Sequence, residues 1–465
     1  MAKVPLTSGA DILPTAETQS REAAETTGRY IVTFREGADP QAATAALSNF
    51  GLRTATAADF RESAVDFQTL GAADSVVLPE IGVAVVSAEP DQMASMSAAD
   101  EASPILAVEP ERYVYALSAP APVRLEEPEV QEAAPRIDLS PAAAAYVRGY
   151  RDALDSFTSS LLSSAGAEAS AAAIAPTAFV ETNFTWGLQA TRVHLSPLSG
   201  RGIRVAVLDT GMDLQHPDFA GRSITAASFV PGQAPQDGHG HGTHCIGTSC
   251  GPRTPGVRPR YGIAYEAAIF VGKVLNNAGS GTDGWILAGI NWAVANGCPV
   301  ISMSLGRPVN PGEPPPVAYE TAARNALNRR CLIVAAAGND SNRSAGVIRP
   351  VSAPANCPSI MAVGAIDENF RIANFSNRAI NGGGGEVNLV GPGVRVRSSW
   401  PMPTRYNTIS GTSMATPHVA GIAALYAQTS PLLRGAQLWL RLLNTARNIV
   451  TIPPVDDGRG LVQII

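Results

Sequence analysis

Five near-continuous apolar runs constrain the fold more than any other feature of this sequence. They read RVAVLD, AIFVGKVL, PVISMSL, CLIVAAAG and SIMAVGAI, and they occupy residues 204–209, 268–275, 299–305, 331–338 and 359–366. Such runs are typical of strands buried on both faces of a parallel sheet. Helical stretches lie between several of them, at 284–296 and 316–328. The alternation predicts an α/β fold, a parallel sheet with helices on both faces.

A smaller α+β unit is predicted ahead of this sheet, at residues 28–117. Strand signals at 30–34 and 75–87 alternate with two helix starts, Asp39-Pro40 and Glu89-Pro90, and the segment 105–117 has extended character. Asp39 is a good N-cap, and proline suits the first helical position. The order β-α-β-α-β indicates a ferredoxin-like domain. Residues 1–27 are polar without an apolar period, which predicts a disordered segment.

Residues 118–183 are predicted to form a linker that contains one amphipathic helix, at 141–162. Repeated prolines and glutamates open the segment. In the helix, Val147, Tyr150, Leu154, Phe157 and Leu161 recur at helical spacing and make one apolar stripe. This stripe would dock on the chain's own globular body or serve as a handle for a protein partner. The remainder, 184–465, is predicted to be a separate domain.

Composition excludes several classes of function. The net charge of −6 over 465 residues does not suggest a nucleic-acid partner, and no apolar run is long enough for a membrane span. The N-terminus lacks the basic start and apolar run of a secretory signal, so we expect a cytoplasmic location, or an extracellular one if a leader has been removed. The five cysteines are odd in number and scattered, which fits neither a disulfide framework nor a zinc pattern.

Three polar residues lie in short motifs that are suited to chemistry. Asp209 ends the first apolar run in LDTG, His241 lies in DGHGHGTHCIGT, and Ser413 lies in SGTSMATPHVAG, where small residues open an apolar helix. Each could be structural by itself, as a turn residue or a helix cap. The spacing of His239, His241 and His244 also invites a metal site, but no carboxylate is spaced to complete one.

Taken together, the three motifs resemble the active-site signatures of the subtilisin family of serine peptidases, over about residues 184–465. The chain order Asp, His, Ser differs from that of chymotrypsin and of the α/β-hydrolases. HGTHC and TISGTSMATPHVAG are most similar to the proteinase K branch. The resemblance implies a subtilisin-like sheet and a serine endopeptidase that needs no cofactor for catalysis. Its substrates would be proteins or peptides.

The resemblance also implies a role for each residue. Asp209, His241 and Ser413 would form the catalytic triad, in which the histidine activates the serine hydroxyl and the aspartate orients the imidazole. Asn339, in AAAGN, matches the family's side-chain donor of the oxyanion hole. Cys245 matches a free thiol near the proteinase K active site and is not expected to be the nucleophile.

The substrate cleft can be carried over in the same way. Gly279, Ser280 and Gly281 match one of the two extended segments that sandwich a substrate strand, and Ser304, Leu305 and Gly306 match the other. Ala336, Ala337 and Gly338 match a wall of the first specificity pocket, whose small residues leave room for a large apolar side chain. Two acids depart from the family's pattern. Asp283 replaces an aromatic at the rim of the fourth pocket, where a solvated acid would favour a cationic side chain such as Arg, and Asp340 follows the oxyanion asparagine at the rim of the first.

Asp367 matches an acidic ligand of a calcium site in proteinase K, so the resemblance implies a weak structural Ca²⁺ there. The long calcium loop of subtilisin is missing after HGTHCIGT, which puts the family's strong calcium site in doubt.

Residues 28–117 resemble the family's inhibitor-type propeptide. In relatives its last residues lie in the active site like a product, which predicts cleavage between Leu117 and Ser118 and an autoinhibited zymogen. Two other functions stay open at this point: a catalytically silent member that binds peptides, and a scaffold that works through the 141–162 helix.

Overall fold

The structure is a computed structural model, and it describes residues 26–57, 73–97, 103–117 and 179–465. The predicted helix at 141–162, the scissile residue Ser118, most of the predicted linker and nearly all of the N-terminal segment lie outside the described residues. We call residues 179–465 the main body and residues 26–117 the N-terminal module.

The main body is built on one parallel sheet, as the apolar runs predict. It has seven strands in the order β14-β13-β12-β10-β6-β8-β7, and every neighbouring pair is parallel. The strands are β6 (Arg204–Asp209), β7 (Ile224–Ser228), β8 (Ala268–Lys273), β10 (Val300–Met303), β12 (Leu332–Ala336), β13 (Met361–Ile366) and β14 (Leu389–Pro392). Nearly all their residues are buried, which is why they read as uninterrupted apolar runs.

Helices cover both faces of this sheet. A Cβ at Gly289 of α7 would meet Leu208, whereas the next residue of β6, Asp209, bonds to His241 of α6. Because successive side chains of a strand point to opposite faces, α6 and α7 lie on opposite sides. The helices are α5 (Trp186–Ala190), α6 (His241–Cys250), α7 (Asp283–Ala295), α8 (Val317–Asn328), α9 (Thr412–Thr429), α10 (Gly435–Thr445) and α11 (Pro454–Asp457).

Shorter elements complete the main body. Two short strands, β9 (Ser280–Thr282) and β11 (Leu305–Gly306), lie outside the parallel sheet, and β15 (Val396–Ser399) pairs antiparallel with β16 (Tyr406–Ile409). The 3-10 helices are η2 (Val193–Leu195), η3 (Pro217–Phe219) and η4 (Arg343–Ala345).

Strand order reverses at β6. From β6 the chain goes to β7 and β8 on one side of the sheet and then crosses to β10 on the other. In open α/β sheets the functional site lies at such a switch point, outside the carboxyl ends of the strands. Asp209 ends β6 and Ser304 follows β10, so both stand at this point.

The N-terminal module is a small α+β unit, but its order differs from the predicted β-α-β-α-β, because the segment 75–87 forms two strands and a short further strand precedes it. It runs β1 (Thr26–Phe34), α2 (Pro40–Asn49), β2 (Thr54–Thr56), β3 (Ser75–Leu78), β4 (Val83–Val86), α3 (Pro90–Ser97) and β5 (Ile105–Ala116). Its strands lie in the order β5-β1-β4-β3-β2. The Asp39 side chain accepts the backbone N–H of Gln41 at the start of α2, as predicted from the Asp-Pro pair.

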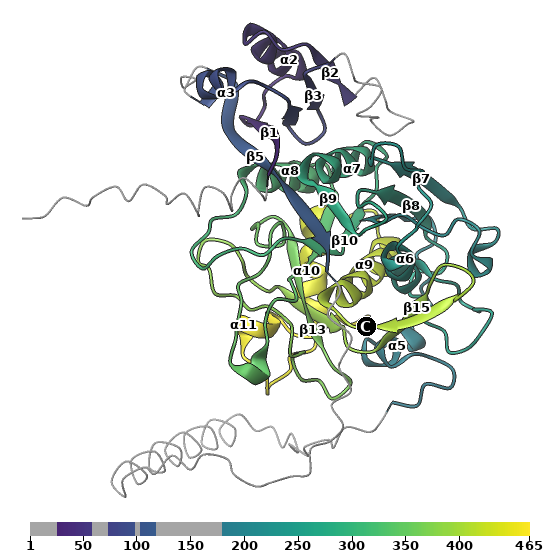
Figure 1. The fold of residues 1–465 in the computed structure, drawn as a ribbon. Helices are drawn as coiled ribbons and strands as arrows, with labels where there is room; N and C mark the ends of the chain where they lie inside the picture. The colour runs from purple at the N-terminus through teal and green to yellow at the C-terminus, as the bar shows by residue number, and fades with distance from the viewer. Residues whose placement is uncertain (1–25, 58–72, 98–102, 118–178) are drawn as a thin grey trace, which may run out of the picture. The chain divides into compact units, whose positions relative to one another are not determined.

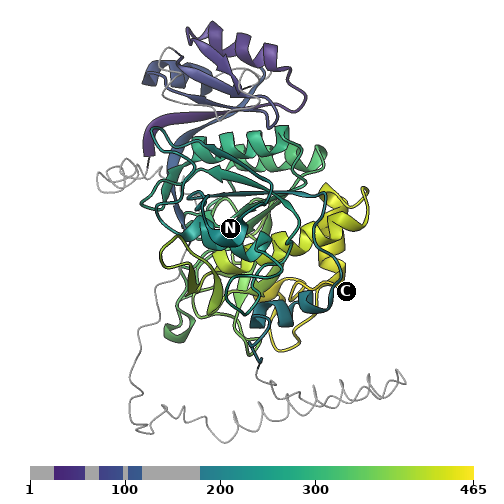
Figure 2. The same ribbon diagram turned by 90° about the vertical axis from the view of Figure 1, so that its right-hand side faces the viewer.

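The two faces of the module's sheet have different partners. Val32, Val77 and Val86 belong to a small core that the module shares with its own helices. The alternate residues Ile31, Val76 and Val85 belong to the large core of the main body. Helices α7 and α8 contact both the module's strands and the main body's sheet (Figure 2). The sheet face that carries Ile31, Val76 and Val85 is therefore buried against these two helices.

Strand β5 connects the two parts of the chain. One half pairs with β1 inside the module, and its end pairs with β9 and β11 of the main body. Figure 1 shows this strand leaving the module and running along β9.

Candidate active site

Asp209 and His241 form a buried hydrogen-bonded pair. Asp209 is the last residue of β6, and His241 is the first residue of α6. His241 Nδ1 lies 2.8 Å from Asp209 Oδ1, and the same oxygen accepts the backbone N–H of Thr210 over 2.7 Å. A carboxylate only accepts, so Nδ1 carries a proton. In the neutral ring Nε2 therefore presents its lone pair. The histidine is thereby prepared to act as a base through Nε2.

The pair also tunes the charge of the imidazole. Burial alone would lower the pKa of His241, but the negative charge of Asp209 and its hydrogen bond act against burial and hold that pKa well above its usual value. The protonated imidazole is thus stabilised at the place where a catalytic base must hold a proton. This is the behaviour expected of a general base that later acts as a general acid.

Ser413 stands at the second position of α9 and is fully buried. Its hydroxyl donates to the carbonyl oxygen of Ser304 over 3.0 Å, and the Ser304 hydroxyl donates back to the Ser413 carbonyl over 2.8 Å. Within the described residues His241 Nε2 has no hydrogen-bond partner. The hydroxyl must therefore rotate from Ser304 before His241 can take its proton. Sequence reasoning did not predict this reciprocal serine pair, because it joins residues 109 positions apart.

Cys245 lies between the histidine and the serine. Its Sγ is 3.9 Å from His241 Nδ1, and the thiol contacts the Ser413 carbonyl oxygen over 3.5 Å. Burial raises the pKa of this thiol, so it stays protonated. A protonated, fully buried thiol agrees with the expectation that Cys245 is not the nucleophile.

Asn339 contacts the backbone at the end of β5. Its side-chain Nδ2 donates to the Leu117 carbonyl oxygen over 2.6 Å. Its Oδ1 accepts both the N–H and the hydroxyl of Thr412, over 2.9 and 2.8 Å, which fixes the amide with its nitrogen toward Leu117. Asn339 thus offers a donor to the oxygen of one particular peptide group, as an oxyanion hole requires.

The last residues of β5 lie between two segments of the main body. Tyr113, Val114 and Tyr115 pair antiparallel with β9, while Tyr115 and Ala116 pair with β11. Ala116 N donates to Gly279 O over 2.8 Å, and Leu117 N donates to Ser304 O over 3.3 Å. The two segments predicted to sandwich a substrate strand are brought together here: Gly279, Ser280, Gly281, Ser304, Leu305 and Gly306.

Leu117 is 8% exposed, so its side chain lies in a pocket, which the resemblance makes the first specificity pocket. A Cβ added at Gly306 would lie 3.0 Å from Leu117 Cδ1 and 3.4 Å from Ser352 Cβ, so Gly306 and Ser352 bound this pocket. The predicted residues Ala336, Ala337 and Gly338 are buried, and a Cβ at Gly338 would also meet Ser352. Ser352 was missed from the sequence because it lies in a loop, SAPAN, that carries no motif.

Asp340 is exposed at the rim of the pocket, as expected, but its carboxylate is tied to neighbours. Its Oδ2 accepts the Ser352 hydroxyl over 3.1 Å and the Asn377 amide over 2.9 Å. One oxygen of Asp340 therefore helps to fix the positions of Ser352 and Asn377. Asn377 was also missed from the sequence, since nothing in FSNRA marks a residue that reaches back to position 340.

Asp283 differs from the expectation. We predicted a solvent-facing charge at the rim of the fourth pocket, open to a cationic side chain. Instead the side chain is buried, its Oδ2 accepts the backbone N–H of Arg112 over 2.8 Å, and its Oδ1 accepts the Tyr319 hydroxyl over 3.0 Å. Arg112 is the sixth residue back from the Leu117 carbonyl, counting Leu117 as the first. With both oxygens engaged, the basis for a preference for Arg at the fourth position is lost.

The residues do not fit the metal sites that the sequence raised. His244 Nε2 lies 3.0 Å from the Val396 carbonyl oxygen, and burial lowers its pKa to about 3, so its ring is neutral and turned to the backbone. Among the described residues the one cluster of metal-ligating atoms is Asp209, His241 and Cys245, within 4.8 Å of one another. The first two already bond to each other.

The surroundings of Asp367 do not fit a calcium site. Its Oδ1 accepts the backbone N–H groups of Asn369 and Arg371, and its Oδ2 pairs with the Arg371 guanidinium over 2.8 Å. Ca²⁺ takes six to eight oxygen ligands, of which this is one carboxylate already neutralised by an arginine. The expectation of a calcium ligand at Asp367 finds no support in this arrangement.

No helix within the described ranges combines the length and apolar character that a membrane crossing needs.

Comparison with known proteins agrees with this geometry. The sequence model of a family described as the subtilase family matches residues 200–460. M-protease of Shouchella clausii (strain KSM-K16) is 42% identical over 269 residues, which is 57% of this chain and 65% of the relative. Subtilisin Savinase of Lederbergia lenta is 42% identical over 269 residues, 57% of this chain and 91% of the relative. Subtilisin E of Bacillus subtilis (strain 168) is 40% identical over 280 residues, 60% of this chain and 68% of the relative.

The chain thus spans somewhat less than two thirds of the length of M-protease. Two of these relatives carry the name subtilisin and the third is called a protease, and the closer likeness to the proteinase K branch stays a prediction.

Proposed function

Because this chain belongs to the subtilase family, we propose that it is a serine endopeptidase made as an autoinhibited zymogen. The N-terminal module would be its inhibitor-type propeptide, with the cut between Leu117 and Ser118. One observation carries the proposal: Leu117 ends a strand that lies in the cleft, and its carbonyl oxygen accepts the Asn339 amide over 2.6 Å. The chain's own peptide group is then held where a substrate's reacting carbonyl would be held.

The proposed reaction starts at Ser413. Its hydroxyl turns from the Ser304 carbonyl toward His241 Nε2, which takes the proton while Oγ attacks the carbonyl carbon of residue 117. The negative charge that develops on the carbonyl oxygen is stabilised by Asn339 and by the positive end of the α9 helix dipole.

Collapse of this tetrahedral intermediate releases the amine. His241 returns the proton to the departing amine of residue 118, and the serine ester that remains is hydrolysed when His241 activates a water molecule. Asp209 keeps the proton on Nδ1 and stabilises the imidazolium in both steps. This sequence of steps uses side chains of the chain alone and calls for no cofactor.

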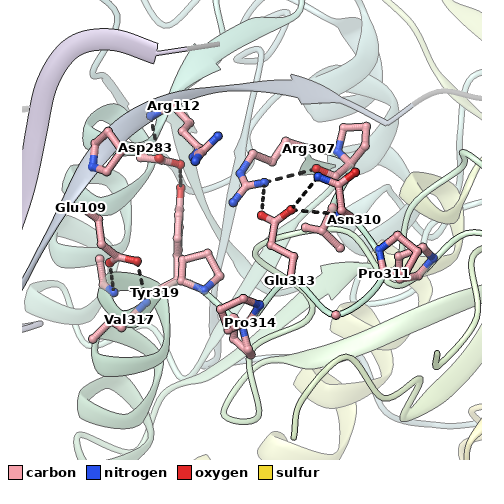
Figure 3. Close-up of a pocket in the computed structure, with 18 of the residues that line it drawn as sticks. Glu109, Arg112, Asp283, Arg307, Asn310, Pro311, Glu313, Pro314, Val317 and Tyr319 are labelled. Carbon is pink, nitrogen blue, oxygen red and sulfur yellow. Dashed lines mark hydrogen bonds and ion pairs between the residues drawn. The ribbon is translucent and has the colours of Figure 1, made fainter. Parts of the chain in front are cut away.

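Two glutamates of β5 support the inhibitor role of the module. Glu109 accepts the backbone N–H groups of Val317 and Ala318, over 3.0 and 2.8 Å, at the start of α8 (Figure 3). Glu111 accepts the N–H of Gly284 over 2.9 Å, in the first turn of α7. Helix N-termini leave such N–H groups without an internal partner, and their dipoles favour negative charge. These two glutamates thereby anchor β5 to the N-termini of both helices.

The proposed substrates are proteins and peptides that bind as an extended strand. Backbone pairing with β9 and β11 accepts many sequences, and the first pocket supplies the preference. Since Leu117 is held against Gly306 in a pocket that Ser352 also bounds, we propose a preference for large apolar side chains before the cut.

Analysis of the purified protein's N-terminus by mass spectrometry tests the proposal. The full chain is expressed and incubated, and we expect a fragment that begins at Ser118 together with hydrolysis of casein. A chain that stays uncut and hydrolyses neither casein nor a peptide library would overturn the proposal. Hydrolysis with a cut elsewhere would retain the peptidase and refute only the assigned cleavage site.

A further inference from the structure

The backbone ladder between β5 and β9 ends at a defined residue. Tyr113 is the last residue of β5 to pair with β9, opposite Thr282. The next residue on the main-body side is Asp283, where α7 begins, so its backbone turns into the helix. A strand that continued along this edge would leave the N–H of its next residue without a backbone acceptor.

The Asp283 side chain takes the place of that acceptor. Figure 3 shows its carboxylate between the Arg112 backbone and the Tyr319 ring, and the N–H of Arg112 donates to Oδ2 over 2.8 Å. Tyr319, which is 3% exposed, donates its hydroxyl to the other carboxylate oxygen, Oδ1, over 3.0 Å. Asp283 is 9% exposed with β5 in place, and Tyr319 of α8 holds its carboxylate independently of β5. It is a pre-oriented acceptor rather than a solvated surface acid.

A large cavity lies beside this contact. Arg112, Asp283 and Tyr319 line a cavity of about 1320 Å³, which the loop 307–316 closes on its far side. That loop is stiffened by the ion pair between Arg307 and Glu313, over 2.8 Å. The contact that Asp283 makes is with a peptide N–H, a group that every residue except proline carries.

We infer that Asp283 is a specificity-determining residue that extends recognition of the substrate backbone to the sixth residue before the cut, through the N–H of that residue. The inference rests on the proposed function, since it takes β5 as the image of a bound substrate. It requires only that the substrate be a peptide with an N–H at this position. Proline, which has none, is then excluded there.

A single-atom change in a peptide tests this. Two substrates carry the sequence of residues 109–120, and in one of them an ester oxygen replaces the N–H of the residue equivalent to Arg112. The enzyme is obtained by maturation of the full chain. We expect kcat/KM for the amide to exceed that for the ester about tenfold, the lower end of what a hydrogen bond to a charged group provides. In Asp283→Ala the ratio falls to about one, and in Asp283→Asn, whose amide oxygen still accepts, it falls only in part.

Two controls keep the test decisive. Asp367→Asn removes a carboxylate outside the cleft and leaves the amide-to-ester ratio unchanged. Tyr319→Phe, which frees one oxygen of Asp283, lowers the ratio and gives a second reading if Asp283→Ala is unstable. A carboxylate that only stabilised the start of α7 would move the melting temperature and not this ratio.

Affinities of the two peptides are also measured by fluorescence polarisation, so that the comparison does not depend on turnover. Equal affinities and equal kcat/KM in the wild-type protein overturn the inference while the peptidase assignment stands. Absence of turnover with unequal affinities refutes the proposed function and retains the role of Asp283 in binding.

Discussion

The Asn339 side chain donates to the carbonyl oxygen of Leu117 over 2.6 Å, and both hydrogen-bonding groups of Thr412 hold its own oxygen from behind. The amide cannot turn over without losing these two bonds. An oxyanion donor that is fixed before the reaction contributes most to the transition state, because no reorganisation is needed when charge appears.

Asn339→Ala should therefore lower kcat about 10²–10³-fold and leave KM almost unchanged, a magnitude that comes from subtilisin itself. Steady-state kinetics with one peptide substrate measure both parameters. Asn328→Ala, at the exposed end of α8, is the matched control. A change confined to KM would show that Asn339 binds the ground state instead.

Ser413→Ala should leave the chain at full length and abolish peptide hydrolysis without a change in fold. Its hydroxyl bonds only to the Ser304 carbonyl in the described part of the chain, so its loss removes one hydrogen bond from a well-packed helix start. A fluorophosphonate probe followed by peptide mapping should label wild-type Ser413 and leave the variant unlabelled. Labelling at another residue, or normal turnover in the variant, would refute the triad.

Glu111→Ala should weaken the hold of the N-terminal module about 10- to 100-fold. The buried carboxylate pairs with Arg29 over 2.7 Å and accepts the Gly284 N–H, and loss of a hydrogen bond to a charged group has an effect of this size. After the processed complex is diluted, peptidase activity appears with a lag, and the length of this lag measures how tightly the module is bound. The lag should shorten in the variant. Glu36→Ala, in an exposed turn of the module, should leave the lag unchanged.

Gly306→Ala should shift selectivity at the residue before the cut. The new Cβ would lie 3.0 Å from Leu117 Cδ1 and 2.9 Å from the Ala353 carbonyl oxygen, so a large side chain no longer fits. We expect kcat/KM for Leu to fall roughly tenfold or more relative to Ala, within the range that one methyl group provides in an apolar pocket. Gly382→Ala adds a methyl group where nothing lies within 4 Å and should leave the ratio intact.

Inhibition by the module should weaken as pH rises. Burial under β5 raises the pKa of Asp283 to about 6. A group whose pKa is raised in the complex binds its proton more tightly there, so its contribution to affinity is full at low pH and is lost as pH rises through about 6. The charged or titratable groups that face it are Arg112 and Glu111 on β5, Arg307 beyond β11, and Tyr319 on α8.

Dissociation of the processed complex, measured at pH 5 and at pH 8, checks this sign. The difference between the two values should shrink in Asp283→Asn, which cannot titrate. An equal pH dependence in the variant would assign the effect to another group, such as His241.

Much of this fold follows from patterns that are local in the sequence. Strands buried on both faces produce continuous apolar runs, so β6, β12 and β13 were predicted within a few residues of their bounds. Asp209, His241 and Ser413 were recognised because their three motifs together resemble the signatures of the subtilisin family, whereas each motif alone could be structural.

Contacts between distant segments could not be predicted. The direction of the Asp283 carboxylate depends on Arg112 and Tyr319, 171 and 36 positions away, and neither position carries a motif. Ser352 reaches the first pocket through a loop whose path is set by packing rather than by its own residues. The sequence also shows the alternation of β1 and β4 but not which of their two faces meets the main body.

Strand β5 belongs at once to the module's sheet and to the cleft, and this has a consequence in time. A cut after Leu117 removes none of the pairing that holds the strand, so hydrolysis alone does not liberate the enzyme. It changes a tethered contact of fixed effective concentration into an association that obeys mass action. The active fraction would then depend on the protein concentration. It would also depend on how fast the enzyme molecules that have already released their module degrade the free modules. Activation would begin with a delay and then accelerate.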